Sequence, residues 1–159
     1  MELTDVLAQA LKLEADGQEF YNKMATEVED QAGREMFRQL AADEVDHYNY
    51  IKRQAEALQQ GKGWATIPEM DMVESLDAVS LVFPPDEKVP QELGEDPDEE
   101  QALLFGLGVE SKSFTLYHNS AERAKDEEAK KLFMQLAGAE HRHFEILMQR
   151  YESRFQYPR

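Results

Sequence analysis

The chain has 159 residues and a mass of 18.3 kDa, enough for one domain with a sizeable hydrophobic core. Its 17 basic and 33 acidic residues give a net charge of −16, which argues against nucleic-acid and membrane partners because both need a basic surface. Cysteine is absent, so disulfides, thiol nucleophiles and cysteine-ligated metal centres are excluded. The sequence shows neither a signal peptide nor an apolar run of the ~18 residues that a membrane span needs, and we expect a cytoplasmic protein.

Apolar residues recur every three or four positions in four segments, which predicts an all-α fold without strands. We expect helices at about residues 4–29, 32–60, 97–123 and 127–156. Thr4 or Asp5 is the expected N-cap of the first helix, and Asp96 is the expected N-cap of the third. Short breaks near residues 30–33 and before residue 127 divide the four helices into two hairpins. Gly61 is expected to end the second helix.

The segment 61–96 between the hairpins contains four of the six prolines. Its 36 residues are too many for a turn between neighbouring helices. Fully extended, they would reach roughly 100 Å, well beyond the ~40 Å length of one of these helices. We therefore predict a single domain, residues 1–159, in which a long crossover joins two hairpins of a four-helix bundle. Within the crossover we expect Trp64 to anchor the start and a short helix near residues 71–79.

The two hairpins are related by an internal repeat. A shift of 96 residues aligns positions 14–47 with positions 110–143 without a gap, and 10 of the 34 aligned pairs are identical. The identical pairs include core residues, such as Phe37 with Phe133, and also charged residues. Two half-bundles of common ancestry account for this pattern, so the hairpins should be pseudo-symmetric.

Six ionisable residues occupy repeat-related positions on the apolar stripes: Glu14, Glu44, His47, Glu110, Glu140 and His143. Four carboxylates in one core would repel one another, and the stripes carry no basic residue near them. Two divalent cations would balance the four negative charges, with two neutral imidazoles completing the coordination shells. The alternative is a hydrated polar core of satisfied hydrogen bonds, which leaves the shared spacing unexplained.

These residues make the chain resemble the ferritin-like di-iron carboxylate superfamily, and in particular the rubrerythrin group. The resemblance covers the bundle, the crossover, and one Glu plus one Glu-x-x-His in each half. It implies a ferritin-like fold with two iron ions, four glutamate ligands and two histidine ligands at the six positions. It also places Tyr21 and Tyr117, seven residues beyond Glu14 and Glu110, close to the metals, although a plain core role is equally compatible with their spacing.

The sequence departs from the rubrerythrin pattern in two ways. Ser113 stands where rubrerythrins carry a further glutamate ligand, so the metal movement implied by that ligand is in doubt. Without cysteine the chain also lacks the rubredoxin module, and it resembles stand-alone rubrerythrin-like domains. Such a domain has to take electrons from an external donor protein.

The resemblance implies an oxidoreductase that reduces peroxide or dioxygen, which we expect to be a homodimer. Two alternatives remain open. A ferroxidase or iron-storage subunit would have to build a hollow shell, and we see no fifth helix after the fourth ends near Arg154. A static bundle could instead hold zinc or manganese without turnover, because oxygen-rich sites capped by imidazole accept iron, manganese and zinc.

Overall fold

A computed structural model describes residues 3–63 and 98–155 of the chain. Within these ranges the chain forms four α-helices and no strand. They are α1 (Leu3–Glu27), α2 (Gln31–Gln59), α4 (Glu99–Arg123) and α5 (Glu127–Arg154). The all-α prediction is therefore confirmed for the described residues. The predicted anchor Trp64 and the predicted helix near 71–79 lie outside them.

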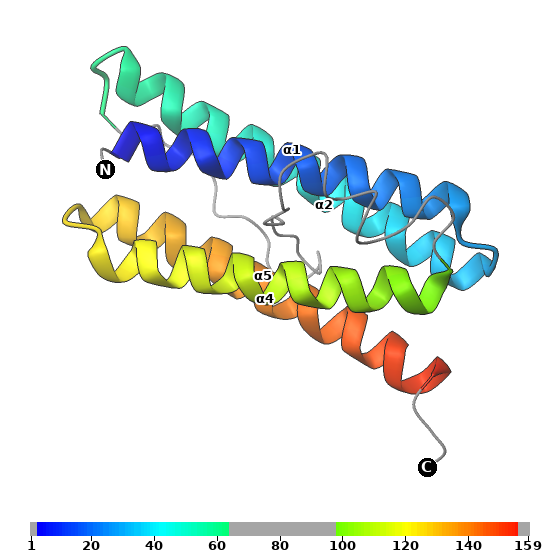
Figure 1. Ribbon diagram of the computed structural model, residues 1–159. Helices are drawn as coiled ribbons and strands as arrows, with labels where there is room; N and C mark the ends of the chain where they lie inside the picture. Colours follow the sequence, from blue (N-terminus) through cyan, green and yellow to red (C-terminus); the bar gives the residue numbers. More distant parts are fainter. Residues whose placement is uncertain (1–2, 64–97, 156–159) are drawn as a thin grey trace.

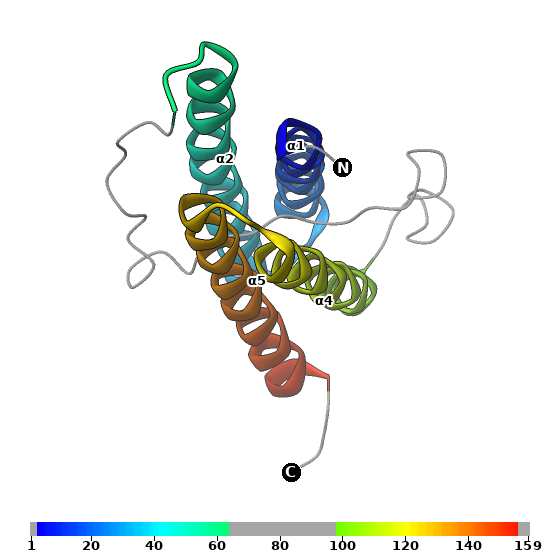
Figure 2. The ribbon, with the colours of Figure 1, turned by 90° about the vertical axis from the view of Figure 1, so that its left-hand side faces the viewer.

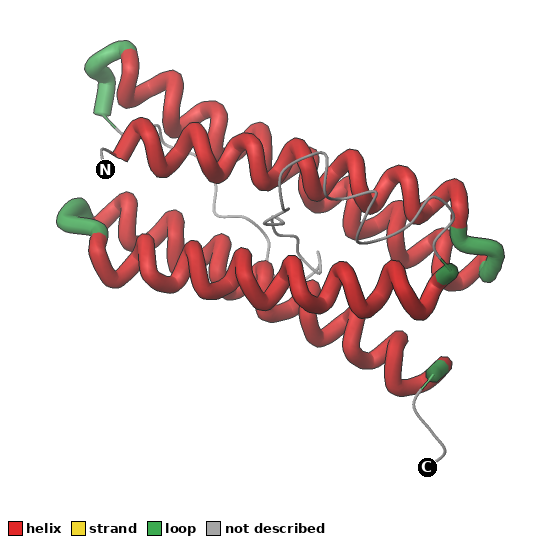
Figure 3. The backbone as a smooth tube through the Cα atoms, viewed as in Figure 1, coloured by secondary structure: helices red, strands yellow, loops and turns green. Residues whose placement is uncertain are grey.

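Aspartates cap the N-termini of three helices, and the loops that precede two of them, α2 and α5, are short (Figure 3). Asp30 accepts a hydrogen bond from the backbone N–H of Gly33 over 3.0 Å, and Asp126 accepts from two N–H groups in the first turn of α5. Asp98 forms a reciprocal capping box with Gln101 at the start of α4. At the other end of α2, Gly61 has φ +72°, a left-handed conformation that glycine adopts without strain and that ends the helix as expected.

Two of the predicted helix starts were wrong. Asp98, not Asp96, is the N-cap of α4, because its side chain and that of Gln101 satisfy each other's backbone N–H groups. Thr4 and Asp5 both lie inside α1, which already begins at Leu3. The break after α1 is also earlier than predicted, since α2 begins at Gln31, directly after its N-cap Asp30.

The helices pair as two antiparallel hairpins, α1 with α2 and α4 with α5. Figure 1 shows that α2 and α4 run in the same direction, as a long connection between the hairpins requires. In the end view of Figure 2, α2 faces α5 and α1 faces α4, so the four helices form the ferritin-like four-helix bundle.

The hydrophobic core consists of two clusters at different levels of the bundle. One cluster includes Phe20, Phe37, Leu103 and Leu147, and the other includes Leu7, Ile51, Tyr117, Phe133 and Leu136. Each helix contributes to both clusters, and between its two contributions each helix places polar residues in the interior. A buried polar layer therefore crosses the middle of the bundle, between two apolar zones that keep water away from it.

Candidate metal centre

The polar layer contains all six of the ionisable residues singled out in the sequence. Each is fully or almost fully buried, with at most 2% of its surface exposed: Glu14, Glu44, His47, Glu110, Glu140 and His143. Every helix contributes at least one of them. On each helix, apolar residues before and after the ionisable residue pack in the core, so the same helix face is buried. The repeat places them at matching levels in the two hairpins.

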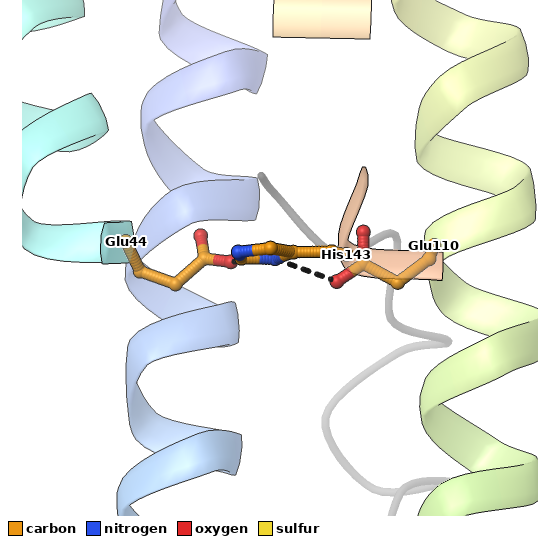
Figure 4. Close-up of side chains that lie close together, drawn as sticks. All are labelled: Glu44, Glu110 and His143. Atoms are coloured by element: carbon orange, nitrogen blue, oxygen red, sulfur yellow. Dashed lines mark hydrogen bonds and ion pairs between the residues drawn. The ribbon is translucent and has the colours of Figure 1, made fainter. Parts of the chain in front are cut away.

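Three of the six residues come close enough together to hold one ion. In the described part of the chain, Glu44, Glu110 and His143 form the one group whose candidate ligand atoms all lie within 4.8 Å of one another. Figure 4 shows their side chains pointing toward each other from three different helices. His143 Nδ1 lies 3.2 Å from Glu110 Oε1 and 3.8 Å from Glu44 Oε1. Two carboxylate oxygens and one imidazole nitrogen thus converge on a common point.

The other three residues adjoin this group without forming a second tight trio. His47 Nδ1 lies 3.8 Å from Glu14 Oε1, a distance beyond a hydrogen bond. Glu140 is close enough to Glu110, Glu14 and Glu44 for their negative charges to act on it. The structure therefore brings all six residues into one layer and gathers three of them at coordinating distance.

Several polar atoms of the layer have no hydrogen-bond partner in the described structure. They are both carboxylate oxygens of Glu44 and of Glu140, Oε2 of Glu110, Nδ1 of His47 and Oγ of Ser113. A buried acceptor without a donor costs roughly 1–3 kcal/mol, and more when it is charged. So many acceptors without donors in one place would strongly destabilise the fold unless protons or a cation satisfied them.

The pKa values of the buried glutamates also indicate that no positive charge compensates them among the described residues. Burial raises the pKa of Glu44 well above its ordinary value, and the nearby charges of Glu14 and Glu110 raise it further. The pKa of Glu140 is raised by burial and then by the charge of Glu110. Burial also lowers the pKa of His47, which favours the neutral imidazole that a metal ion requires.

Two buried tyrosines border the layer, one in each apolar cluster. The Tyr21 hydroxyl on α1 donates to Glu110 Oε1 on α4 over 2.5 Å. In the opposite sense, the Tyr117 hydroxyl on α4 donates to Glu14 Oε1 on α1 over 3.5 Å. Both tyrosines contact a carboxylate of the opposite hairpin. Burial and the charge of Glu110 raise the pKa of Tyr21 well above its usual value, so this hydroxyl stays protonated and remains a donor.

Asp43 belongs to the layer but was missed in the sequence. It is 2% exposed, and its Oδ2 lies 3.3 Å from Nε2 of His143 on α5. Burial lowers the pKa of His143, but the charge of Glu110 and the hydrogen bonds to Asp43 and Glu110 outweigh this effect and raise it. The spacing could have revealed it, because Asp43 lies three residues after Leu40 and four before His47 on the same helix face. It was overlooked because the repeat has Ala139 at the matching position.

The donor set fits a hard or borderline divalent cation. It offers carboxylate oxygens and imidazole nitrogens, which suit iron, manganese and zinc, and it contains no sulfur ligand. A cation at Glu44, Glu110 and His143 would meet both oxygens of Glu44 and Oε2 of Glu110, which have no hydrogen-bond partner among the described residues, and it would offset the negative charge of the layer. The buried Glu/His group is therefore a possible metal site.

Comparison with known proteins identifies the family to which the fold belongs. The family model for the ferritin-like domain matches residues 2–151. Two solved structures are similar over almost the whole chain. A hypothetical protein from Pyrococcus furiosus has a TM-score of 0.68 and 24% identity, over 96% of this chain and 89% of that one. An uncharacterized conserved protein from Magnetospirillum magnetotacticum MS-1 has a TM-score of 0.69 and 22% identity, over 100% and 99% of the two chains.

No curated protein matches the sequence. Among the described residues, no helix is long and apolar enough to cross a membrane. The family match spans both hairpins, and the bundle has the helix pairing and the buried carboxylate and histidine layer of a di-iron-type protein. The chain therefore belongs to the ferritin-like domain family.

Proposed function

We propose that the protein is a non-haem dinuclear metal protein that holds two iron ions between its hairpins. The ligands would be the four buried glutamates and two buried histidines: Glu14, Glu44, His47, Glu110, Glu140 and His143. The observation that carries this proposal is the buried layer itself, in which four glutamates from four helices lie together and carboxylate oxygens on α2, α4 and α5 have no hydrogen-bond donor among the described residues. One ion at Glu44, Glu110 and His143 leaves Glu14, His47 and Glu140 for a second, and two ions offset four carboxylates.

We further propose that the protein reduces hydrogen peroxide or dioxygen with electrons from an external donor. A bound pair of ferrous ions would supply two electrons to an O–O bond. Reduction of hydrogen peroxide to two water molecules would consume these two electrons and two protons. A separate protein would return the electrons, because the chain has no cysteine with which to hold an iron–sulfur or rubredoxin centre.

The chain's own residues support such a reaction in three ways. The two apolar clusters exclude bulk water from both sides of the polar layer. Glutamates whose pKa values are raised, such as Glu44 and Glu140, can hold a proton when no cation is near and release it to water when a metal ion binds. Tyr21 donates to Glu110 and keeps one carboxylate oriented.

The metal proposal is tested by metal content. Wild type, loaded anaerobically with ferrous ion and freed of excess metal, should retain about two ions per chain, and Glu44→Ala/Glu140→Ala should retain neither. A matched control is Glu35→Ala/Glu145→Ala, which removes two exposed glutamates from the same two helices. Retention of two tightly bound ions in Glu44→Ala/Glu140→Ala would overturn the assignment.

The redox proposal is tested with ferrous-loaded protein and hydrogen peroxide. Without a donor, about one peroxide per pair of iron ions should be consumed. With reduced methyl viologen as an artificial donor, consumption should continue. Sustained consumption with NAD(P)H and no second protein would contradict the need for an external donor. A loaded protein that never reacts with peroxide or dioxygen would be a static metal bundle, and elution as a 24-subunit shell would favour iron storage.

A further inference from the structure

We propose that Asp43 is a positioning residue that makes the two metal sites unequal, so that the site containing His143 binds its ion first and more tightly. This inference rests on the proposed dinuclear centre and concerns the order in which it fills. It comes from a difference between the two hairpins, which otherwise repeat the same ligand pattern.

The Asp43 carboxylate is fixed between two partners. Gln39, one turn earlier on α2, donates its amide N–H to Oδ1 over 3.0 Å, and Oδ2 lies 3.3 Å from Nε2 of His143. Asp43 is 2% exposed, so water does not compete strongly for these contacts. The Asp43 carboxylate thus contacts the imidazole of His143 at Nε2, through Oδ2.

This contact orients the His143 ring toward the metal position. An imidazole that donates Nε2–H to Asp43 carries the lone pair of a metal ligand on its other nitrogen, Nδ1. Nδ1 is the atom that lies 3.2 Å from Glu110 Oε1 and 3.8 Å from Glu44 Oε1. A carboxylate behind a ligating histidine fixes its tautomer and increases its basicity, which typically changes metal affinity by about 10–100-fold.

His47 has no equivalent of this contact, because the repeat differs at the matching position. The repeat places Ala139 where Asp43 stands, so no carboxylate can act on His47 from the matching position. Gln135, the counterpart of Gln39, instead accepts a hydrogen bond from the Tyr50 hydroxyl over 3.3 Å. Among the described residues, His47 makes no hydrogen bond to an acid, and its closest carboxylate contact is Glu14 at 3.8 Å. The ring of His47 is therefore less firmly oriented than that of His143.

Zinc titration against a chromophoric chelator tests the proposal without relying on activity. Wild type should bind two zinc ions in two resolved steps. Asp43→Ala should weaken the tighter step by about 10–100-fold and leave the weaker step unchanged, so that the two steps merge. Asp43→Asn retains an acceptor oxygen without the charge and should recover part of the loss. Asp46→Ala, which removes an exposed acid from the same helix, should leave both steps as in wild type.

Histidine NMR identifies which site fills first. With one equivalent of zinc and ¹⁵N-labelled histidine, the Nδ1 resonance of His143 should shift while that of His47 stays unchanged. In Asp43→Ala, one equivalent should divide between the two histidines. Prior shifting of His47 in wild type would overturn the proposal.

The remaining outcomes separate this inference from the function on which it rests. If wild type binds no zinc in the polar layer, the dinuclear proposal fails and this inference fails with it. If wild type binds two ions but Asp43→Ala weakens both steps equally or neither, the dinuclear centre stands and the role of Asp43 is overturned. Melting of the metal-free variants completes the test, because a lower melting temperature with unchanged zinc steps would leave Asp43 a purely structural residue.

Discussion

Tyr21 on α1 donates its hydroxyl to Oε1 of Glu110 on α4 over 2.5 Å, and so joins the two hairpins across the polar layer. The pseudo-symmetric contact, from Tyr117 to Glu14, spans 3.5 Å. The same residue types at repeat-related positions thus make a short contact in one half and a long one in the other. Together with Asp43 behind His143, the short contact places two positioning groups around the same trio of candidate ligands.

Removal of the Tyr21 hydroxyl should weaken the site containing Glu110. We expect Tyr21→Phe to reduce zinc affinity for one step by about tenfold or more, since a hydrogen bond to a charged group contributes roughly 1.5–3 kcal/mol. Tyr117→Phe is the matched control and should have a smaller effect, because its contact is longer. Competition titration of both variants measures the difference. Equal losses in the two variants would show that the contact distances do not determine the affinity.

A second link between the hairpins lies at the end of the bundle where α2 and α4 begin. Arg150 on α5 donates through Nε to Glu99 over 2.5 Å and also bonds Asp30, the N-cap of α2. Because the Glu99 side chain is 7% exposed, loss of its main partner should leave a largely buried carboxylate without enough donors. We expect Arg150→Ala to lower the free energy of unfolding by about 1–3 kcal/mol, measured by chemical denaturation.

The neighbouring Arg154 is the control for this prediction. It also contacts Asp30 and Glu99, but at 3.3 and 3.7 Å and with a side chain that is 40% exposed. Its replacement by alanine should therefore cost less than about 1 kcal/mol. An Arg154→Ala variant that is as unstable as Arg150→Ala would contradict the assignment of the link to Arg150.

Ser113 is fully buried in the polar layer, and its hydroxyl has no hydrogen-bond partner within residues 3–63 and 98–155. Ser113→Ala removes this orphaned group and improves helix propensity, so the metal-free protein should gain about 1 kcal/mol in the free energy of unfolding. The control is Ser120→Ala on the same helix, whose hydroxyl donates to the Leu116 carbonyl over 2.8 Å. A larger gain in Ser120→Ala than in Ser113→Ala would show that the Ser113 hydroxyl is satisfied in solution.

The fold was largely predictable because its determinants are local. Apolar spacing predicted the four helices and the short break before residue 127, where α5 begins. The burial of six ionisable residues was predictable because the repeat fixes their register twice. What sequence reasoning missed depends on distant partners or on a break in the repeat. Arg150 and Glu99 are 51 residues apart and pair only in three dimensions, while Asp43 has no acidic counterpart at Ala139.

The stability of the metal-free protein should depend on pH through its buried glutamates. The pKa values of Glu44 and Glu140 are raised in the folded state, first by burial and then by neighbouring negative charges. Between the unfolded value, about 4.3, and the raised folded values, the folded protein binds more protons than the unfolded chain. The glutamate contribution to stability is thus complete below the unfolded pKa and is lost as pH rises toward the folded values. His47, whose pKa is lowered, acts in the opposite direction below about pH 6.5.

Replacement of both glutamates by glutamine removes this pH dependence while leaving both histidines in place. We expect metal-free Glu44→Gln/Glu140→Gln to melt higher than metal-free wild type at pH 7, by roughly 2–4 °C for each kcal/mol gained. Zinc should raise the melting temperature of wild type by mass action and leave that of the double variant almost unchanged. Melting curves from about pH 5 to 8, with Glu35→Gln/Glu145→Gln as the exposed control, measure both effects. If the double variant melts below metal-free wild type at pH 7 and zinc stabilises it fully, these two glutamates do not form a buried cluster that a metal ion compensates.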